Sequence, residues 1–472
     1  MYNNRIPDLN RRAFMKRAAA IAGLGAAAPM ALNLASVGEA AAMDATDYKA
    51  IVCCFFYGGN DYANTVIPYD LPNYDLYSAI RGGASGRQRG GVALGHSELD
   101  GTVLTTLTPQ TLTNDIRYAL APELPGVASL FNTGHAAIQL NVGPLVVPLT
   151  LAQYQSNSKA YPQPPKLFSH NDQSSIWQSL GSEGATVGWG GRMGDLAMAS
   201  NGQSLMTCIS ASGNAVFVSG NNTLQYQIST DGAVPIWPAK GWVFGSSETS
   251  ALLKQLITEP RAHAMENAFN VVTKRSMDME AIVNAALDPV TLTTHFDQTN
   301  DFAKQFEIVA RLIAARNALG TKRQVFFVSM GGFDNHDGLM TQHPKLMATF
   351  NSAITSFYNA TVELGVANKV TTFTASDFGR TLAYNGDGSD HGWGSHYFII
   401  GGAVKGGQFY GTAPHISLET DDQVGQGRLL PSTAVDQMAS TLGRWFGLSG
   451  SEITSVLPNI GNFSTANLGF MG

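Results

Sequence analysis

The chain has 472 residues, of which 14% are charged and 50 are glycine, and its formal net charge is −6. An acidic chain offers no electrostatic footprint for nucleic acid, so we expect no nucleic-acid partner. The charged fraction is low against the roughly 25% of ordinary soluble domains, and glycine exceeds its usual share of roughly 7%, so we expect many long loops and tight turns. The three cysteines, Cys53, Cys54 and Cys208, fit neither a disulfide framework nor a zinc-finger spacing, and we expect buried thiols.

Residues 1–42 have the layout of a twin-arginine export signal. Arg11 and Arg12 stand together, and a run of small apolar residues follows over 18–37. Cleavage leaves one large domain of residues 43–472 with a formal charge of −9, because five basic and two acidic residues are lost. We expect the twin-arginine translocase as a partner, a periplasmic or secreted location, and no stable membrane anchor after cleavage. An uncleaved anchor is the alternative.

Next along the chain come strand-like runs that each end in glycine and polar residues. Nearly continuous apolarity is typical of strands buried on both faces. Four runs share this design: KAIVCCFFYGGND (49–61), HAAIQLNVGPL (135–145), KRQVFFVSMGGFDNHDG (322–338) and NKVTTFTASDFGR (368–380).

Helix-like stretches lie between or after these runs, at 250–277, 301–319, 345–364 and 432–447. Strands that alternate with helices predict an α/β fold with a mainly parallel sheet and helices on both faces. Residues 203–245 contain short β-like runs and turns, which predict a small β-rich insertion.

Polar side chains follow the strands where ligands bind in parallel α/β sheets, at the carboxyl ends. Aspartate oxygens and histidine nitrogens together suit zinc or manganese, and magnesium or calcium where oxygen dominates. Glycine-rich turns and a plain ion pair between Asp390 and His391 are the structural alternatives. The candidate metal ligands are Asp61, Asp334, His336, Asp377, Asp390 and His391.

Several nucleotide and peptidase motifs do not occur in the sequence: no Walker A loop, G-x-S-x-G elbow or H-E-x-x-H helix is present. The chain instead resembles, over about 49–460, the bacterial family catalogued as domain of unknown function 1501. That family is similar in fold to the alkaline phosphatase and sulfatase superfamily, which implies an alkaline-phosphatase-like fold. The motifs that carry the resemblance are FFYGGNDYANTVIPYD, FSHNDQSS, VGWGGRMGDL, GGFDNHDG, SDFGRT, GSDHGWGSH and IIGGAVKGGQFYG, in that order.

The resemblance implies one or two divalent metals held at strand ends. Asp61 matches the early superfamily aspartate, Asp334 and His336 match a later pair, and Asp377 and His391 match the last ligands. Phe378 stands where the superfamily has histidine, so one metal site lacks a ligand unless His170 or His391 replaces it. The narrower family usually has glutamate where this chain has Asp377.

The same resemblance implies a nucleophile at a helix N-terminus, and Ser169 with His170 is the best candidate. The alternative is that Ser169 or Asp172 is only an N-cap. Arg380 either clamps a phosphate or sulfate or pairs with Asp377. No cysteine has the C-x-P-x-R context of a formylglycine sulfatase.

The functional hypothesis is an exported metal-dependent hydrolase that acts on phosphate or sulfate esters of a small molecule or glycan. The alternative, from a different class, is a non-catalytic periplasmic binding or scaffold protein that retains the fold.

Overall fold

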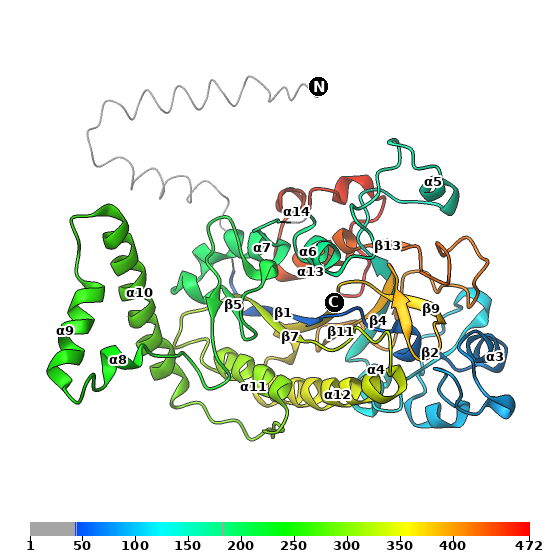
Figure 1. Ribbon diagram of the computed structural model, residues 1–472, viewed down its shortest axis with the longest axis horizontal. Coiled ribbons are helices and arrows are strands. Elements are labelled where there is room, and N and C mark those ends of the chain that lie inside the picture. Colours follow the sequence, from blue (N-terminus) through cyan, green and yellow to red (C-terminus); the bar gives the residue numbers. More distant parts are fainter. Residues whose placement is uncertain (1–42, 44, 182–183) are drawn as a thin grey trace.

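The computed structural model describes residues 43, 45–181 and 184–472, so the predicted export signal at 1–42 lies outside the described residues. A nine-stranded sheet forms the centre of the molecule, in the order β12-β4-β11-β8-β1-β7-β5-β6, with β13 beside β4 (Figure 1). Its strands are β1 (Lys49–Phe56), β4 (Ala136–Gly143), β5 (Cys208–Ser210), β6 (Tyr226–Gln227), β7 (Arg323–Met330), β8 (Val370–Ser376), β11 (Ser395–Gly401), β12 (Phe409–Tyr410) and β13 (Thr433–Ala434).

The central strand β1 pairs in parallel with β7 on one side and β8 on the other. β11 runs antiparallel to both β8 and β4, while the other pairings in this sheet are parallel. The predicted α/β class with a mainly parallel sheet is therefore confirmed. The carboxyl ends of β8, β1 and β7 meet at one edge, which is where the predicted ligands follow the strands.

Helices cover both faces of the sheet (Figure 1). One layer contains α4 (Pro125–Asn132), α11 (Asp301–Ala314) and α12 (Leu339–Glu363), and the other contains α6 (His170–Ser179), α7 (Trp189–Ala197), α13 (Val435–Phe446) and α14 (Gly450–Val456). Successive side chains of a strand point to opposite faces. Cys53 and Phe55 accordingly pack in the core cluster on one side of the sheet, and Cys54 and Phe56 in the cluster on the other. The three cysteines are free and buried, as predicted.

One sequence expectation needs correction. The helix expected over 250–277 is two helices, α9 (Ser247–Thr258) and α10 (Ala264–Leu287), because Pro260 cannot continue a helix. In residues 203–245 the short strands β5 and β6 extend the main sheet at its edge, and the range also includes α8 (Trp237–Lys240). The helices α8, α9 and α10 project together from that end of the molecule (Figure 1).

The remaining elements are smaller. β2 (Val66–Pro68) pairs with β3 (Tyr118–Leu120), and β9 (Arg380–Tyr384) pairs with β10 (Ser389–His391). The other helices are α3 (Leu71–Ile80), α5 (Leu151–Gln155) and the 3-10 turns η1 (Tyr62–Asn64), η2 (Ser85–Arg87), η3 (His96–Thr102), η4 (Thr113–Asp115), η5 (Met198–Ser200), η6 (Ser204–Met206), η7 (Val216–Val218), η8 (Ala367–Lys369) and η9 (Ile460–Asn462). Among the described residues, no helix is both long enough and apolar enough to cross a membrane.

Candidate metal centre

The loops after β1, β7 and β8 pack tightly against one another. Gly58, just after β1, has a φ of +117°, and a Cβ atom there would lie 2.3 Å from the backbone nitrogen of Asp334. Only glycine allows this close approach in this conformation. The Gly58 amide also donates a hydrogen bond of 2.9 Å to Oδ2 of Asp377, after β8. The glycine thus ties the polar ends of the three strands together.

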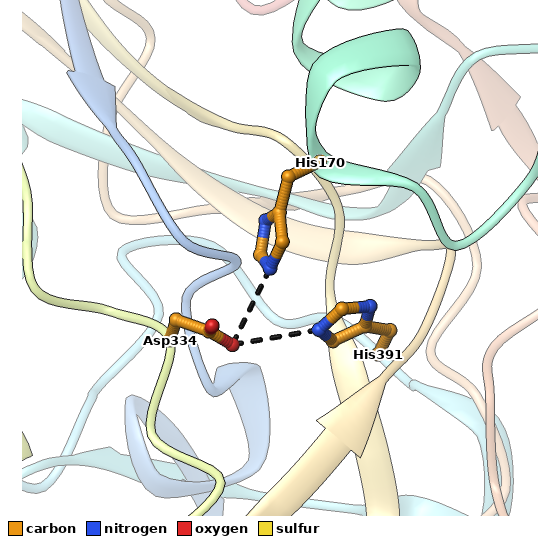
Figure 2. Close-up of side chains that lie close together, drawn as sticks. All are labelled: His170, Asp334 and His391. Atoms are coloured by element: carbon orange, nitrogen blue, oxygen red, sulfur yellow. Dashed lines mark ion pairs between the residues drawn. The ribbon is translucent and has the colours of Figure 1, made fainter.

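Side chains from several elements converge on one carboxylate oxygen, Oδ1 of Asp334. The side chains come from α6, from the loop after β7 and from β10, and Figure 2 shows two of the histidines directed at Asp334. The atoms near Asp334 Oδ1 are Nη1 of Arg380 at 3.0 Å, and the Nε2 atoms of His336 at 3.2 Å, His170 at 3.3 Å and His391 at 3.4 Å.

The other nitrogen of each histidine ring also has a partner. Nδ1 of His170 lies 2.8 Å from Oδ2 of Asp377, and Nδ1 of His336 lies 3.1 Å from Oδ1 of Asp390. The remaining acceptor is a backbone carbonyl, that of Phe168, at 2.7 Å from Nδ1 of His391. An acceptor at Nδ1 keeps the proton on that nitrogen, so Nε2 presents a lone pair toward Asp334.

The lone pairs on Nε2 make this a site for positive charge. Nε2 of His336 and Nε2 of His391 are only 2.8 Å apart, a contact that two lone pairs tolerate only if a proton or a cation lies between or beside them. His170, Asp334 and His391 offer ligand atoms that all lie within 4.8 Å of one another. Imidazole nitrogens with a carboxylate oxygen are a donor set that suits zinc and manganese. The residues therefore fit a divalent cation.

The local electrostatics differ between the histidines. The hydrogen bond to Asp377 raises the pKa of His170 above its ordinary value, which favours a proton at its Nε2 atom wherever no cation takes that place. Partial burial raises the pKa of Asp334, but the hydrogen bond and charge of Arg380 outweigh it, and the net pKa is lowered. Burial lowers the pKa of His391, so this ring resists protonation. Asp334 thus stays ionised, and His391 keeps its lone pair.

Of the predicted metal ligands, the side chains of Asp334, His336 and His391 come together in one cluster, while Asp377 and Asp390 lie behind histidines and orient them. Asp61 is placed differently: it is buried and accepts hydrogen bonds from Arg81 at 2.8 Å and from the Ser389 hydroxyl at 2.6 Å. It also accepts from the backbone amide of Asn64 and so caps the N-terminus of η1. Its oxygens are therefore committed to a buried ion pair and a helix cap.

The residues predicted to be catalytic make different interactions in the structure. His170 joins the cluster, where it contacts Asp334 and Asp377. Arg380 donates to the carbonyls of Gly58 and Ser389 and pairs with Asp334 rather than with Asp377. These interactions occupy the N–H donors of the Arg380 guanidinium within the protein.

Ser169 is at the N-cap position of α6, but its hydroxyl does not cap the helix and donates instead to Oδ2 of Asp172, at 2.6 Å. The sequence analysis did not predict two groups that take part in these interactions. Nothing in the local sequence of Arg81 marks it as the partner of Asp61. The backbone carbonyl of Phe168 could not be singled out because every residue has a carbonyl.

The fold and the cluster define an α/β protein with a histidine and aspartate site at the carboxyl ends of three parallel strands. The chain belongs to the family described as Protein of unknown function (DUF1501), whose family model matches residues 48–457, so the predicted membership is confirmed. A search of curated proteins finds no match.

Solved structures similar to the chain include sulfatases and alkaline phosphatase superfamily members. Ps i-CgsB, in complex with k-i-k-neocarrahexaose, is 9% identical, with coverage of 88% of this chain and 77% of that chain and a TM-score of 0.34. The lipoteichoic acid synthase LtaP from Listeria monocytogenes is 7% identical, with coverage of 89% and 78% and a TM-score of 0.34. A protein in the alkaline phosphatase superfamily from Vibrio parahaemolyticus is 11% identical, with coverage of 86% and 68% and a TM-score of 0.30. Such scores carry no argument about chemistry, which rests on the site itself.

Proposed function

We propose that the protein is an exported metal-dependent hydrolase that acts on phosphate or sulfate esters. The observation that supports this most is the convergence of three Nε2 atoms on one oxygen of Asp334, with every Nδ1 atom held by an acceptor. His170, His391 and Asp334 would hold the cation, and His336 is a further ligand. Acceptors behind histidine ligands fix the ring and raise its basicity, as in known metal sites.

A divalent cation at this place supplies Lewis acidity toward an ester oxygen and lowers the pKa of a nucleophilic hydroxyl or water. Side chains of the protein orient the proposed ligands and accept protons. Asp377 holds the ring of His170, and Arg380 holds the carboxylate of Asp334. The Ser169 hydroxyl, next to His170 in sequence, already donates to the Asp172 carboxylate, which is an acceptor for its proton.

The openness of the site supports the proposed substrate class. The side chain of Asp334 is 49% exposed and that of His391 is 24% exposed, so a bulky group can reach the cluster. This supports an ester of a small molecule or of a glycan outside the cytoplasm, where the predicted export signal would place the protein.

One observation favours a second candidate, a binding or scaffold protein. The N–H groups of Arg380 point to carbonyls and to Asp334, so the best predicted anion clamp has its donors committed within the protein. A protein without a bound metal, whose histidines share protons with Asp334, would retain the fold without hydrolysis.

The deciding experiment is the metal content of natively exported protein, measured by plasma mass spectrometry. A His170→Ala/His391→Ala variant removes two of the proposed ligands, and His415→Ala is the control, because His415 is also partly exposed but pairs with Asp422 instead. We expect about one equivalent of zinc or manganese in wild type and in the control, and none in the double variant. Equal, near-zero metal in all three proteins would refute the hydrolase. A loaded protein that cleaves neither aryl phosphates nor aryl sulfates would favour the binding protein.

A further inference from the structure

The helices α8, α9 and α10 form an arm, residues 237–287, that projects beyond the β5–β6 end of the sheet (Figure 1). Surface helices normally turn their apolar side toward the core. This arm does the opposite, because many of its large apolar side chains are exposed. Single exposed apolar residues are common, but a contiguous group of them marks an interaction surface.

On α10 the exposed apolar residues have helical spacing. Met265, Phe269 and Val272, here called the arm stripe, recur at four and three residues, and Phe269 and Val272 are 63% and 54% exposed. Buried Asn270 marks the opposite side, since its side chain donates to the carbonyl of Leu256 on α9. At about 100° per residue, the stripe lies roughly 100–160° around the helix from Asn270. The stripe therefore faces away from α9, on a side where its side chains are exposed in the described part of the chain.

The start of α8 and the loop between α8 and α9 add aromatic side chains. Trp237, which begins α8, is 69% exposed, and Trp242 and Phe244 of the loop are 74% and 98% exposed. Aromatic side chains bury about 150–250 Å² each, so these three offer on the order of 500 Å² of contact area. The arm stripe lies on α10, whereas these aromatic side chains belong to α8 and the loop after it, and the summed area of both groups approaches the roughly 800 Å² per partner of a stable interface. Exposed Trp and Phe are also the residues enriched where proteins meet.

The charge of the arm indicates what covers it. The arm contains five Lys and Arg residues and five Asp and Glu residues, so it is neutral, whereas the whole chain carries −6. A lipid surface attracts helices with an excess of Lys and Arg on the polar side, which this arm does not have. For an acidic protein, the neutral arm is the place where two copies approach with least repulsion.

We propose that the arm docks against the arm of a second copy of this chain, so that the arm stripe and the exposed aromatic side chains are buried in a homodimer. Two arms at the ends of their sheets meet without covering the histidine cluster, which lies at the carboxyl edge of β8, β1 and β7. The dimer leaves the proposed active site open.

The test is the mass of the purified protein in solution by sedimentation equilibrium. The variant Phe269→Glu/Val272→Glu adds two charges to the arm stripe. The control Leu76→Glu/Val362→Glu adds two charges at exposed apolar positions of α3 and α12, outside the arm. We expect twice the chain mass for wild type and control, and the single chain mass for the arm variant. A monomeric wild type overturns the proposal, including one that binds lipid vesicles, and so does an arm variant that stays dimeric.

Tryptophan fluorescence supplies a second measurement that needs no variant. The chain has six tryptophans, and Trp177, Trp189, Trp393 and Trp445 are buried. Quenching by acrylamide therefore reports Trp237 and Trp242. We expect quenching to rise at least twofold on dilution through the range where the mass halves. Quenching that stays constant through that range overturns the proposal.

Discussion

Replacing Asp377 by Asn separates the charge behind His170 from its hydrogen bond. Asp377 is 2% exposed, and its Oδ2 atom accepts from Nδ1 of His170 at 2.8 Å and from the Gly58 amide at 2.9 Å. An asparagine oxygen in the same place can accept both bonds, so the geometry is kept while the charge is lost. Loss of such an acceptor usually weakens metal binding 10- to 100-fold, which is about 1.4–2.8 kcal/mol.

The assay is zinc affinity of the variant, measured by competition with a chromophoric chelator at neutral pH. Asp390→Asn is the matched comparison, because Asp390 holds His336 in the same way but is partly exposed and more screened by water. We expect a larger loss of affinity for Asp377→Asn than for Asp390→Asn. Affinity unchanged by Asp377→Asn, in a protein that loses metal with His170→Ala, would refute the reasoning that the buried charge matters.

Three further changes test the framework around the site by thermal and urea unfolding. Gly58→Ala forces a side chain into a positive φ and against the backbone of Asp334, so we expect a loss of at least about 2 kcal/mol and weaker metal binding; wild-type stability would contradict this. Asp61→Ala leaves Arg81 buried without its partner and should cost about 3–5 kcal/mol, and a loss below 1 kcal/mol would show that water reaches Arg81. Burial raises the pKa of Asp436 to about 6, so between pH 3.8 and 6 the folded chain keeps a proton that the unfolded chain has lost. Stability attributable to this group falls by about 3 kcal/mol as pH rises through that window, and Asp436→Asn should remove the fall; an identical pH dependence in both proteins would contradict it.

The strands and the position of the site could be predicted from short stretches of the sequence. The runs at 49–56, 323–330 and 370–376 are apolar because the strands are buried on both faces, and their ends are polar because the chain emerges there. What local signals do not contain is strand order. Because β1 lies between β7 and β8, Asp377 and Asp334 reach one site although 43 residues separate them in sequence.

The role of each polar residue was harder to predict, because a carboxylate after a strand can serve a metal, a histidine or an arginine. Asp61 has the same sequence context as Asp334, yet it begins η1 and meets Arg81, 20 residues further on. The choice depends on which long side chain reaches it in the folded protein. His170 shows the converse, since it comes from a helix and not from a strand end.

The charge balance around the cluster bears on the proposed metal site. The side chains that bond to one another include three carboxylates, Asp334, Asp377 and Asp390, and one guanidinium, Arg380, which leaves a formal charge of −2 when the three histidines are neutral. A single proton on His170, whose pKa is raised, balances only one of these charges. A second proton on His391 is opposed by burial, which lowers the pKa of that ring. One divalent cation balances both charges at once, and it also relieves the contact between the two facing Nε2 atoms. The charge balance of the cluster therefore supports the proposed metal site.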